Sequence, residues 1–122
     1  MPTLGEQFAE ALAAKDGERI AELLDPEVDF RALTPNFNWE ASTPEAVVEI
    51  VLGSWFEPKD HLDELVGVRA DRIGDRQTVN YRLRGHNDDG HFLGEQQAYL
   101  EERDGRIVWM RVLCSGMRPT SA

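Results

Sequence analysis

The chain has 122 residues, of which 41% are hydrophobic and 30% charged, and its formal net charge is −10. This composition and length are typical of one folded domain, not of a disordered segment. The negative charge repels polyanions, so we expect no nucleic acid and no anionic membrane as a partner. The sequence shows no signal peptide, no membrane-spanning run of roughly 20 apolar residues and a single cysteine, which together predict a cytoplasmic protein.

The first half of the sequence predicts three helices and a short strand. Thr3 and Glu6 have capping-box spacing and open the first helix. The second helix ends at the Asp-Pro pair at 25–26, before a short strand at 27–33. Thr43, followed by a proline, opens the third helix after a loop that includes at most a brief strand.

The second half predicts an antiparallel meander. Turn signals at 74–75, 87–90 and 104–105 separate its strands. The strands are expected at 62–73, 76–86, 91–103 and 106–116, followed by a frayed tail. Helices followed by such a meander predict an α+β domain. We expect three N-terminal helices packed on a strongly curved antiparallel sheet of four to six strands, with residues 1–122 as a single domain.

Turns of even length determine which side chains share a face of the sheet. With such turns, the face toward the helices carries a partly polar set, namely Tyr81, Gln96, Ile107, Trp109, Arg111, Leu113 and Ser115. The opposite face carries Val108, Met110 and Val112 beside Tyr99, with Cys114 at its end. That face is too apolar for water, so we expect a homodimer to cover it. An odd-length turn at 87–90 would invert the assignment for the last two strands.

An arginine among large apolar residues needs a partner. Burying Arg111 unpaired is very costly, so it must meet a carboxylate, a bound anion or water. Asp29 and Glu102 are the candidate partners within the chain. Two interpretations therefore stay open and are compatible with each other: a satisfied ion pair, and the polar lining of a small-molecule cavity.

The order of elements and two segments, "STPEAVVEIV" and "AYLEERDGRIVWMRVLCSG", resemble the nuclear-transport-factor-2-like superfamily, in particular its SnoaL-like and ketosteroid-isomerase-like branch. The resemblance implies a cone-shaped α+β barrel with a deep pocket, and dimers formed through the outer sheet face. The catalytic sets of the family do not carry over. The first helix has Phe8 and no tyrosine, the Arg69-x-Asp71 pair falls on the outer face, and Ser115 stands where cyclases of the branch have an aspartate.

The expected function is binding of a small apolar or aromatic molecule. Trp39, Trp55 and Trp109, with Gln96 and Ser115, are the predicted contacts, although aromatic residues at this spacing are also typical of a core. If the protein is an isomerase, dehydratase or cyclase, Asp29 is the predicted base, and Tyr81 or Arg111 stabilises the oxyanion. The alternative is a non-catalytic ligand-binding or dimerisation module whose cavity is packed shut.

We expect no cofactor and no metal. His86 and His91 flank the "NDDG" turn, and a metal site with Asp88 or Asp89 is conceivable, but loop histidines of this kind are usually solvated. Ser115 has no evident His–Asp relay, which argues against nucleophilic catalysis.

Overall fold

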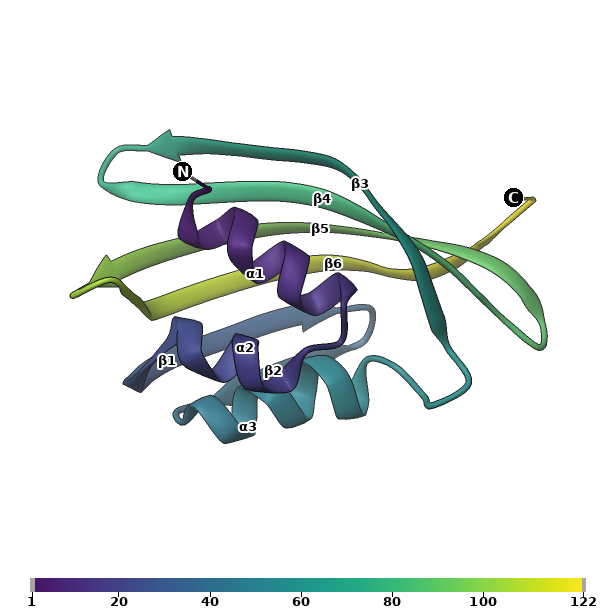
Figure 1. Ribbon diagram of the computed structural model, residues 1–122, viewed down its shortest axis with the longest axis horizontal. Coiled ribbons are helices and arrows are strands. Elements are labelled where there is room, and N and C mark those ends of the chain that lie inside the picture. The colour runs from purple at the N-terminus through teal and green to yellow at the C-terminus, as the bar shows by residue number, and fades with distance from the viewer. Residues whose placement is uncertain (1, 122) are drawn as a thin grey trace.

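Helices cover one face of a six-stranded sheet in the computed structural model, which describes residues 2–121 (Figure 1). The long strands of the second half twist strongly along their length. In chain order the elements are α1 (Leu4–Ala13), α2 (Gly17–Leu23), β1 (Leu24–Thr34), β2 (Phe37–Ala41), α3 (Pro44–Val48), the π-helix η1 (Glu49–Ser54), β3 (His61–Ile73), β4 (Arg76–Asn87), β5 (Gly90–Arg103) and β6 (Arg106–Thr120). The predicted α+β class and the N-terminal position of the helices are confirmed.

The sheet is mixed, which corrects the expectation of a purely antiparallel one. Its strand order is β2-β1-β6-β5-β4-β3. Neighbouring strands are antiparallel except β1 and β6, which run parallel. The parallel pair arises because the last strand returns beside the first strand instead of at a free edge. Both β1 and β6 therefore lie inside the sheet, where the direction of each side chain determines what it contacts.

The helix starts follow the predicted signals. The Thr3 hydroxyl accepts from the Glu6 amide at 3.2 Å, and the Thr3 amide donates to the Glu6 carboxylate at 2.9 Å. The Thr43 hydroxyl accepts from the Ala46 amide at 3.2 Å. At the other end, α2 stops one residue earlier than expected, and the Asp25-Pro26 pair lies inside β1. Proline has no amide hydrogen, and the β1–β6 ladder is irregular across this segment.

The third helix is α-helical at its start and π-helical at its end. It continues as the π-helix η1, and the Trp55 amide donates to the Ile50 carbonyl five residues back at 3.0 Å. Val47 and Val51 are completely buried on the stripe that faces the sheet. The wider π-turn positions Trp55 at the end of this stripe.

A β-bulge in β6 inverts the predicted faces of that strand. The turn at 104–105 has the expected length, and Glu102 pairs with Ile107 as predicted. The next pair joins Glu101 to Trp109, so Val108 is an extra residue with no partner in the ladder. From Trp109 to Cys114, where a second irregularity follows, every side chain of β6 points to the face opposite the predicted one.

The prediction that Trp109, Arg111 and Leu113 point toward the helices is therefore wrong. Met110 and Val112 are fully buried beneath the helices instead, and Leu113 is 48% exposed on the other face. The bulge also places Cys114 on the helical side, whereas it was expected on the outside. Met110 and Val112 are accordingly removed from the surface predicted to contact a second copy.

In the β3–β4 hairpin the predicted faces hold beside the turn, where Ala70 pairs with Val79 as a two-residue turn at 74–75 requires. A bulge at Gly67–Val68 then shifts the register, so Val66, expected opposite Leu83 on the helical side, pairs with Arg82 on the outer face instead. Tyr81 pairs with Gln96 instead of Ala98, because the turn after β4 is centred on Asp88 and Asp89 and not one residue later; the resulting two-residue shift preserves the faces. Both side chains are buried on the helical side, as predicted. The expected frayed tail is instead part of β6, which stays paired as far as Thr120.

The space between the helices and the sheet is filled by side chains. Its largest fully buried members are Tyr81, Phe8, Phe30, Leu12, Ile20, Leu24, Leu83, Leu100, Ile107, Met110, Val28 and Val47. The core therefore occupies the region where a deep central pocket was expected. Among the described residues, no helix is long and apolar enough to cross a bilayer.

Two alanine variants of β6 test the inverted face. Met110→Ala leaves a cavity in the core and should lower the free energy of unfolding by about 2–5 kcal/mol. Leu113→Ala removes a half-exposed side chain and should change it by less than about 0.5 kcal/mol. Urea denaturation at low protein concentration measures both. A larger loss in Leu113→Ala than in Met110→Ala would contradict the bulge at Val108.

Candidate functional site

A small cavity lies where the ends of β1, η1 and β6 meet on the helical side of the sheet. Its volume is ≈ 180 Å³. We call it the two-tryptophan cavity, and its lining is Thr34, Trp39, Ser54, Trp55, Cys114, Gly116 and Met117. Two of the three tryptophans predicted to contact a ligand thus meet here, although they come from different segments. The third, Trp109, lies on the opposite face of the sheet.

Each tryptophan is held by its own element. β2 pairs with β1 and directs Trp39 toward the helical side, beside the buried Ala32. The indole Nε1 of Trp39 donates to the Thr34 hydroxyl at 2.8 Å, which fixes the orientation of the ring. Trp55 follows the π-helix, and its ring centroid lies 6.4 Å from that of Phe30. The two walls of the cavity are therefore anchored independently of each other.

Trp55 carries an unpaired donor. Its indole Nε1 is buried and has no hydrogen-bond partner among residues 2–121. Leaving a buried N–H unsatisfied costs about 1–3 kcal/mol. Such groups are uncommon in native proteins and point to a missing partner or a functional role.

A chain of polar side chains crosses three strands behind the cavity. The Tyr81 hydroxyl donates to the Gln96 carboxamide oxygen at 2.5 Å. Gln96 Nε2 then donates to Cys114 Sγ at 3.3 Å, and the Gly116 amide donates to the same sulfur at 3.4 Å. Gln96, a predicted ligand contact, thus reaches the two-tryptophan cavity only through the Cys114 thiol. Burial, and to a smaller extent the nearby Cys114, raise the pKa of Tyr81, so its phenol stays protonated.

A second cavity lies next to the first, toward the turn between β4 and β5. Its volume is ≈ 270 Å³. We call it the turn-side cavity, and its lining is Trp55, Asp60, Asn87, Asp89, Gly90, His91, Phe92, Met117 and Pro119. Trp55 and Met117 line both cavities. These two side chains form the boundary between them.

Asp29 is the carboxylate that pairs with Arg111, but the pair lies on the outer face. Both guanidinium Nη atoms contact the carboxylate at 3.3 Å. The Nη1 atom also donates to the carbonyls of Asp29 at 3.0 Å and Met110 at 2.9 Å. The Asp29 side chain is 55% exposed. The arginine therefore has the ion pair that the sequence required, without being enclosed.

Trp109 lies between two guanidinium groups on this outer face. The Cζ atoms of Arg76 and Arg111 lie 4.2 and 4.5 Å from its ring centroid. Cations placed over an indole face are attracted by its quadrupole. Trp109, predicted as a cavity contact, instead forms part of the outer surface of the sheet.

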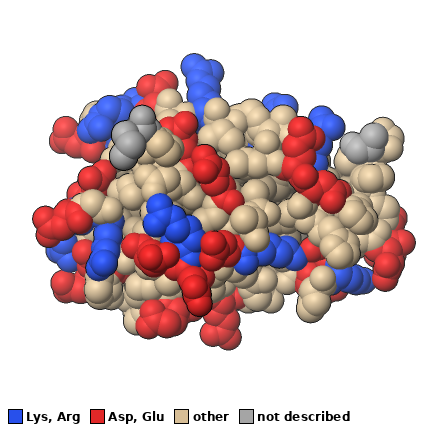
Figure 2. Space-filling view, viewed as in Figure 1, with Lys and Arg blue, Asp and Glu red and all other residues tan. Residues whose placement is uncertain are grey.

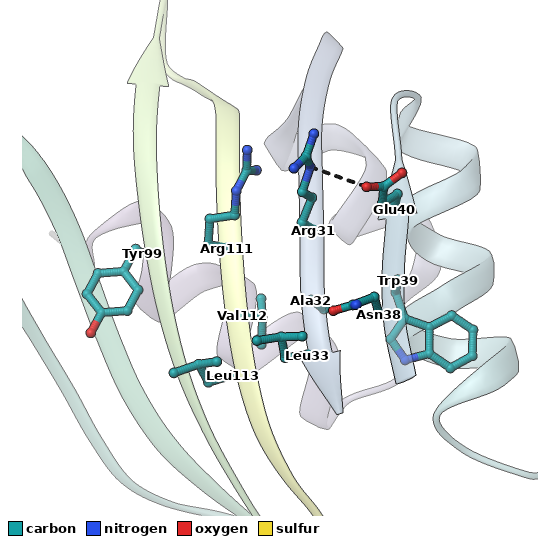
Figure 3. Close-up of a pocket in the computed structure, with 10 residues that line it drawn as sticks. All are labelled: Arg31, Ala32, Leu33, Asn38, Trp39, Glu40, Tyr99, Arg111, Val112 and Leu113. Atoms are coloured by element: carbon teal, nitrogen blue, oxygen red, sulfur yellow. Dashed lines mark ion pairs between the residues drawn. The ribbon is translucent and has the colours of Figure 1, made fainter. Parts of the chain in front are cut away.

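The outer face also contains a shallow hollow over β1, β2 and β6, with a volume of ≈ 450 Å³ (Figure 3). We call it the outer hollow. Leu33 and Leu113 lie side by side in it, and the side chains of Arg31 and Arg111 extend toward the same end. Arg31 forms an exposed ion pair with Glu40 at 3.6 Å. The full lining is Arg31, Ala32, Leu33, Asn38, Trp39, Glu40, Tyr99, Arg111, Val112 and Leu113.

The predicted catalytic residues do not share one site. Asp29 and Arg111 meet on the outer face, whereas Tyr81 is buried on the helical side. Ser115, a predicted ligand contact, accepts from the Glu95 amide at 2.9 Å and donates to the Gly116 carbonyl at 2.8 Å. Its hydroxyl thus stabilises the irregular pairing of β5 and β6 at this point.

The histidines form a row across three strands. His61 and His86 stack with ring centroids 4.8 Å apart, and His91 lies 6.1 Å from His86. His86 Nδ1 lies 2.7 Å from a carboxylate oxygen of Asp63. Within residues 2–121, no group of three or more His, Cys, Asp or Glu residues is arranged to hold a metal ion.

Five of the seven residues that line the two-tryptophan cavity were not among the predicted contacts, namely Thr34, Ser54, Cys114, Gly116 and Met117. Cys114 was expected on the outer face because the bulge at Val108 has no clear sequence signal. Met117 lay between the strand expected at 106–116 and the frayed tail expected at 118–122. Its neighbour in the ladder is Gly94, and a glycine opposite a large flexible side chain is the sequence signal that could have identified this position.

Comparison with solved structures supports the predicted resemblance. A candidate isomerase from Bacillus subtilis superposes with a TM-score of 0.69 at 20% identity, covering 88% of this chain and 81% of that protein. A protein from Catenulispora acidiphila with a ketosteroid isomerase-like fold, solved with trimethylamine, gives 0.70 at 16% identity and covers 92% and 85%. IdmH from Streptomyces antibioticus, described as a candidate polyketide cyclase, gives 0.68 at 18% identity and covers 88% and 86%.

The chain has a ketosteroid-isomerase-like fold. No family model and no curated protein sequence matches the chain. At this level of sequence identity the similarity establishes the fold alone. Any function has to be inferred from the residues of this chain. In this ketosteroid-isomerase-like fold, the two-tryptophan cavity lies on the helical side of the sheet and the outer hollow on the opposite side.

The raised pKa of Tyr81 predicts a loss of stability at alkaline pH. Unfolding returns the phenol to its ordinary pKa of 10.0, so its contribution is fully present below pH 10 and is lost as the pH rises further. The unfolding free energy should therefore fall by about 1.4 kcal/mol per pH unit above pH 10 through this group. Urea denaturation between pH 9 and pH 11 measures the slope.

Tyr81→Phe should remove this component of the slope, and Tyr99→Phe, on the outer face, should keep it because Tyr81 is retained. Tyr81→Phe should also lower stability by about 1–3 kcal/mol at pH 7, since the Gln96 oxygen loses its donor. An unchanged alkaline slope in Tyr81→Phe would show that the phenol is not the titrating group.

Proposed function

We propose that this protein binds a small, flat, apolar molecule in the two-tryptophan cavity and acts as a homodimer. The observation that carries the binding proposal is that Trp39 and Trp55, held by separate elements, wall one cavity, and that the indole N–H of Trp55 is buried without a partner. Large aromatic walls with a few polar groups are typical of small-molecule sites. Among the similar structures, one holds trimethylamine and another is a candidate cyclase, so the fold suits small ligands.

The proposal is binding and does not include a named reaction. The residues predicted for proton transfer are divided between the two faces of the sheet, and no single ligand position would contact all three. Catalysis by Asp29, Tyr81 and Arg111 stays a prediction, which retained activity in Asp29→Ala and Arg111→Ala would dismiss. The free Cys114, whose sulfur accepts two N–H donors, suits a reducing compartment such as the cytoplasm.

The outer face is the surface proposed for the second copy. The protein carries a net charge of −10, and acidic side chains are spread over the helical side (Figure 2). Two such molecules repel each other unless the surfaces that meet are locally balanced. On the outer face, arginines alternate with acids in ion pairs at 3.2–3.6 Å, which are Arg31–Glu40, Arg76–Glu101, Arg82–Glu95 and Arg111–Asp29.

Apolar contact area lies within this balanced surface. Leu33 and Leu113 are neighbours in the β1–β6 ladder and are 49% and 48% exposed. Trp109 and Tyr99 flank them on the same face. In a two-fold dimer the same patch is used by both copies, so a surface with both signs of charge around an apolar centre can pair with itself. The proposed dimer interface thus stays on the outer face of the sheet. Its apolar centre is formed by Leu33, Leu113 and Trp109 in place of Met110 and Val112.

A charge placed in the apolar centre should separate the copies. Leu113→Asp introduces a carboxylate that a second copy would bury, and we expect at least a tenfold rise in the dimer dissociation constant. Ile73→Asp is the matched control, because Ile73 is exposed at the tip of the β3–β4 hairpin, away from the patch. Sedimentation velocity across a range of concentrations measures both. A monomeric wild type, or equal weakening by both variants, would reject the outer face as the interface.

Ligand binding is tested with naphthalene as a flat, uncharged probe. Trp55→Ala removes one wall of the cavity and should weaken naphthalene binding about tenfold. Trp109→Ala is the control, because it removes a tryptophan of the outer face. Chemical-shift titration measures affinity and location together. The proposal fails if naphthalene shifts no resonance of the cavity, or if Trp109→Ala weakens binding as much as Trp55→Ala.

A further inference from the structure

Met117 is the side chain that separates the two-tryptophan cavity from the turn-side cavity. It lines both of them, together with Trp55. The cavities measure ≈ 180 and ≈ 270 Å³, and each is smaller than the roughly 300 Å³ at which small-molecule pockets begin. A ligand of ordinary size that is to be enclosed here therefore has to occupy both cavities, which requires the boundary between them to move.

The Met117 side chain occupies space that is free because the residue opposite it on β5 has no side chain. Gly94 is its partner in the ladder. A Cβ placed on Gly94 would lie 2.4 Å from Met117 Sδ and 2.5 Å from its terminal methyl carbon, so the methionine could not keep this position beside any other residue. The thioether thus lies directly over the backbone of Gly94. Methionine is unbranched and adaptable, so it can leave this seat by rotating its own side chain while the strand stays in place.

The polar groups around the boundary select the kind of ligand. The Trp55 Nε1 hydrogen has no partner and would gain one from an acceptor atom on a ligand. Asp60 and Asp89 line the turn-side cavity and disfavour an anion there. The combination favours an uncharged molecule with a flat apolar body and one acceptor oxygen at its edge.

We infer that Met117 is a movable partition, and that the ligand displaces it to join the two cavities and accept a hydrogen bond from Trp55 Nε1. This inference rests on the proposed small-molecule function and adds two things to it, the residue that sets ligand size and the chemical class of the ligand. A closed partition makes the site small and leaves the Trp55 donor unpaired. When Met117 is displaced, the joined cavities have room for the ligand, and the ligand's oxygen accepts from Trp55 Nε1.

The test compares two probes of nearly the same shape, 2-acetylnaphthalene and 2-ethylnaphthalene. Only the first carries an acceptor oxygen. We expect wild type to bind 2-acetylnaphthalene about fivefold more tightly, the effect of one neutral hydrogen bond. Trp55→Phe keeps an aromatic wall, removes the N–H and should bind the two probes equally. Equal binding by wild type, or a preference that survives in Trp55→Phe, overturns the assignment of the donor.

The partition is tested with the same probes in Met117→Ala. Removing the side chain should tighten binding of both probes about tenfold, because neither probe then has to displace it. Ile73→Ala is the control, because it removes an exposed apolar side chain at the tip of the β3–β4 hairpin, which lines neither cavity. Unchanged affinity for both probes in Met117→Ala overturns the partition.

A direct readout in wild type keeps the test independent of whether the variants fold. The three indole N–H resonances are assigned from single Trp→Phe variants and followed during titration. The Trp55 resonance should move downfield with 2-acetylnaphthalene and not with 2-ethylnaphthalene; an equal response to both probes overturns the hydrogen bond. Failure of the proposed function is distinguishable, because neither probe would then bind wild type or Met117→Ala.

Discussion

One extra residue in β6 determines which side chains meet in this molecule. β6 lies between β1 and β5 in the sheet, so its two faces contribute both to the core and to the outer surface. The bulge at Val108 directs Met110 and Val112 into the core and Arg111 out to Asp29. Without it, a guanidinium would lie among apolar side chains and two large apolar residues would face water, and each arrangement is costly. The bulge is thus the lower-energy register for this sequence.

A second irregularity, between Gly94 and Gln96, builds the candidate site. The ladder pairs Gln96 with Cys114 but Gly94 with Met117, so β6 carries one more residue than β5 across this step. Gly116 adopts a φ of +80°, a conformation that glycine takes without strain. The Ser115 hydroxyl accepts from the amide of Glu95, which has no partner in the β5–β6 ladder. As a result Cys114 and Met117 both line the two-tryptophan cavity, which a regular strand would not allow for residues three apart.

The sequence alone predicted those parts of the fold that depend on interactions between residues close together in the chain. The capping hydroxyls of Thr3 and Thr43 predicted helix starts because each satisfies an amide at its own helix end. The pairing of Ala70 with Val79 followed from the two-residue turn beside it. The structure brings Trp39 and Trp55 to one cavity, and their contact with a ligand stays a prediction.

The bulge at Val108 escaped prediction because its sequence context, "RIVWMRV", offers apolar residues to both faces. A regular strand and a bulged strand each bury an apolar stripe, and alternation alone does not separate them. Only the long-range pairing of Arg111 with Asp29 on the outer face, together with the packing of Met110 beneath the helices, distinguishes the two registers. That information lies in the tertiary structure. The side-chain directions on β6 were predicted by alternation from the turn at 104–105, so those beyond the bulge were wrong.

The distribution of satisfied and unsatisfied polar groups explains why the candidate site lies at the edge of the core. Inside the core, Tyr81 and Gln96 satisfy each other, so a ligand placed there would have to break a short hydrogen bond at 2.5 Å. On the outer face, Arg111 makes contacts with both carboxylate oxygens of Asp29 and with two carbonyls. At the end of η1, by contrast, Trp55 Nε1 has no partner, and a flexible methionine rests on a glycine beside it. A ligand gains the most binding free energy where a hydrogen-bond donor is unpaired and a neighbouring side chain can move aside. Within residues 2–121 those two conditions coincide at Trp55 and Met117.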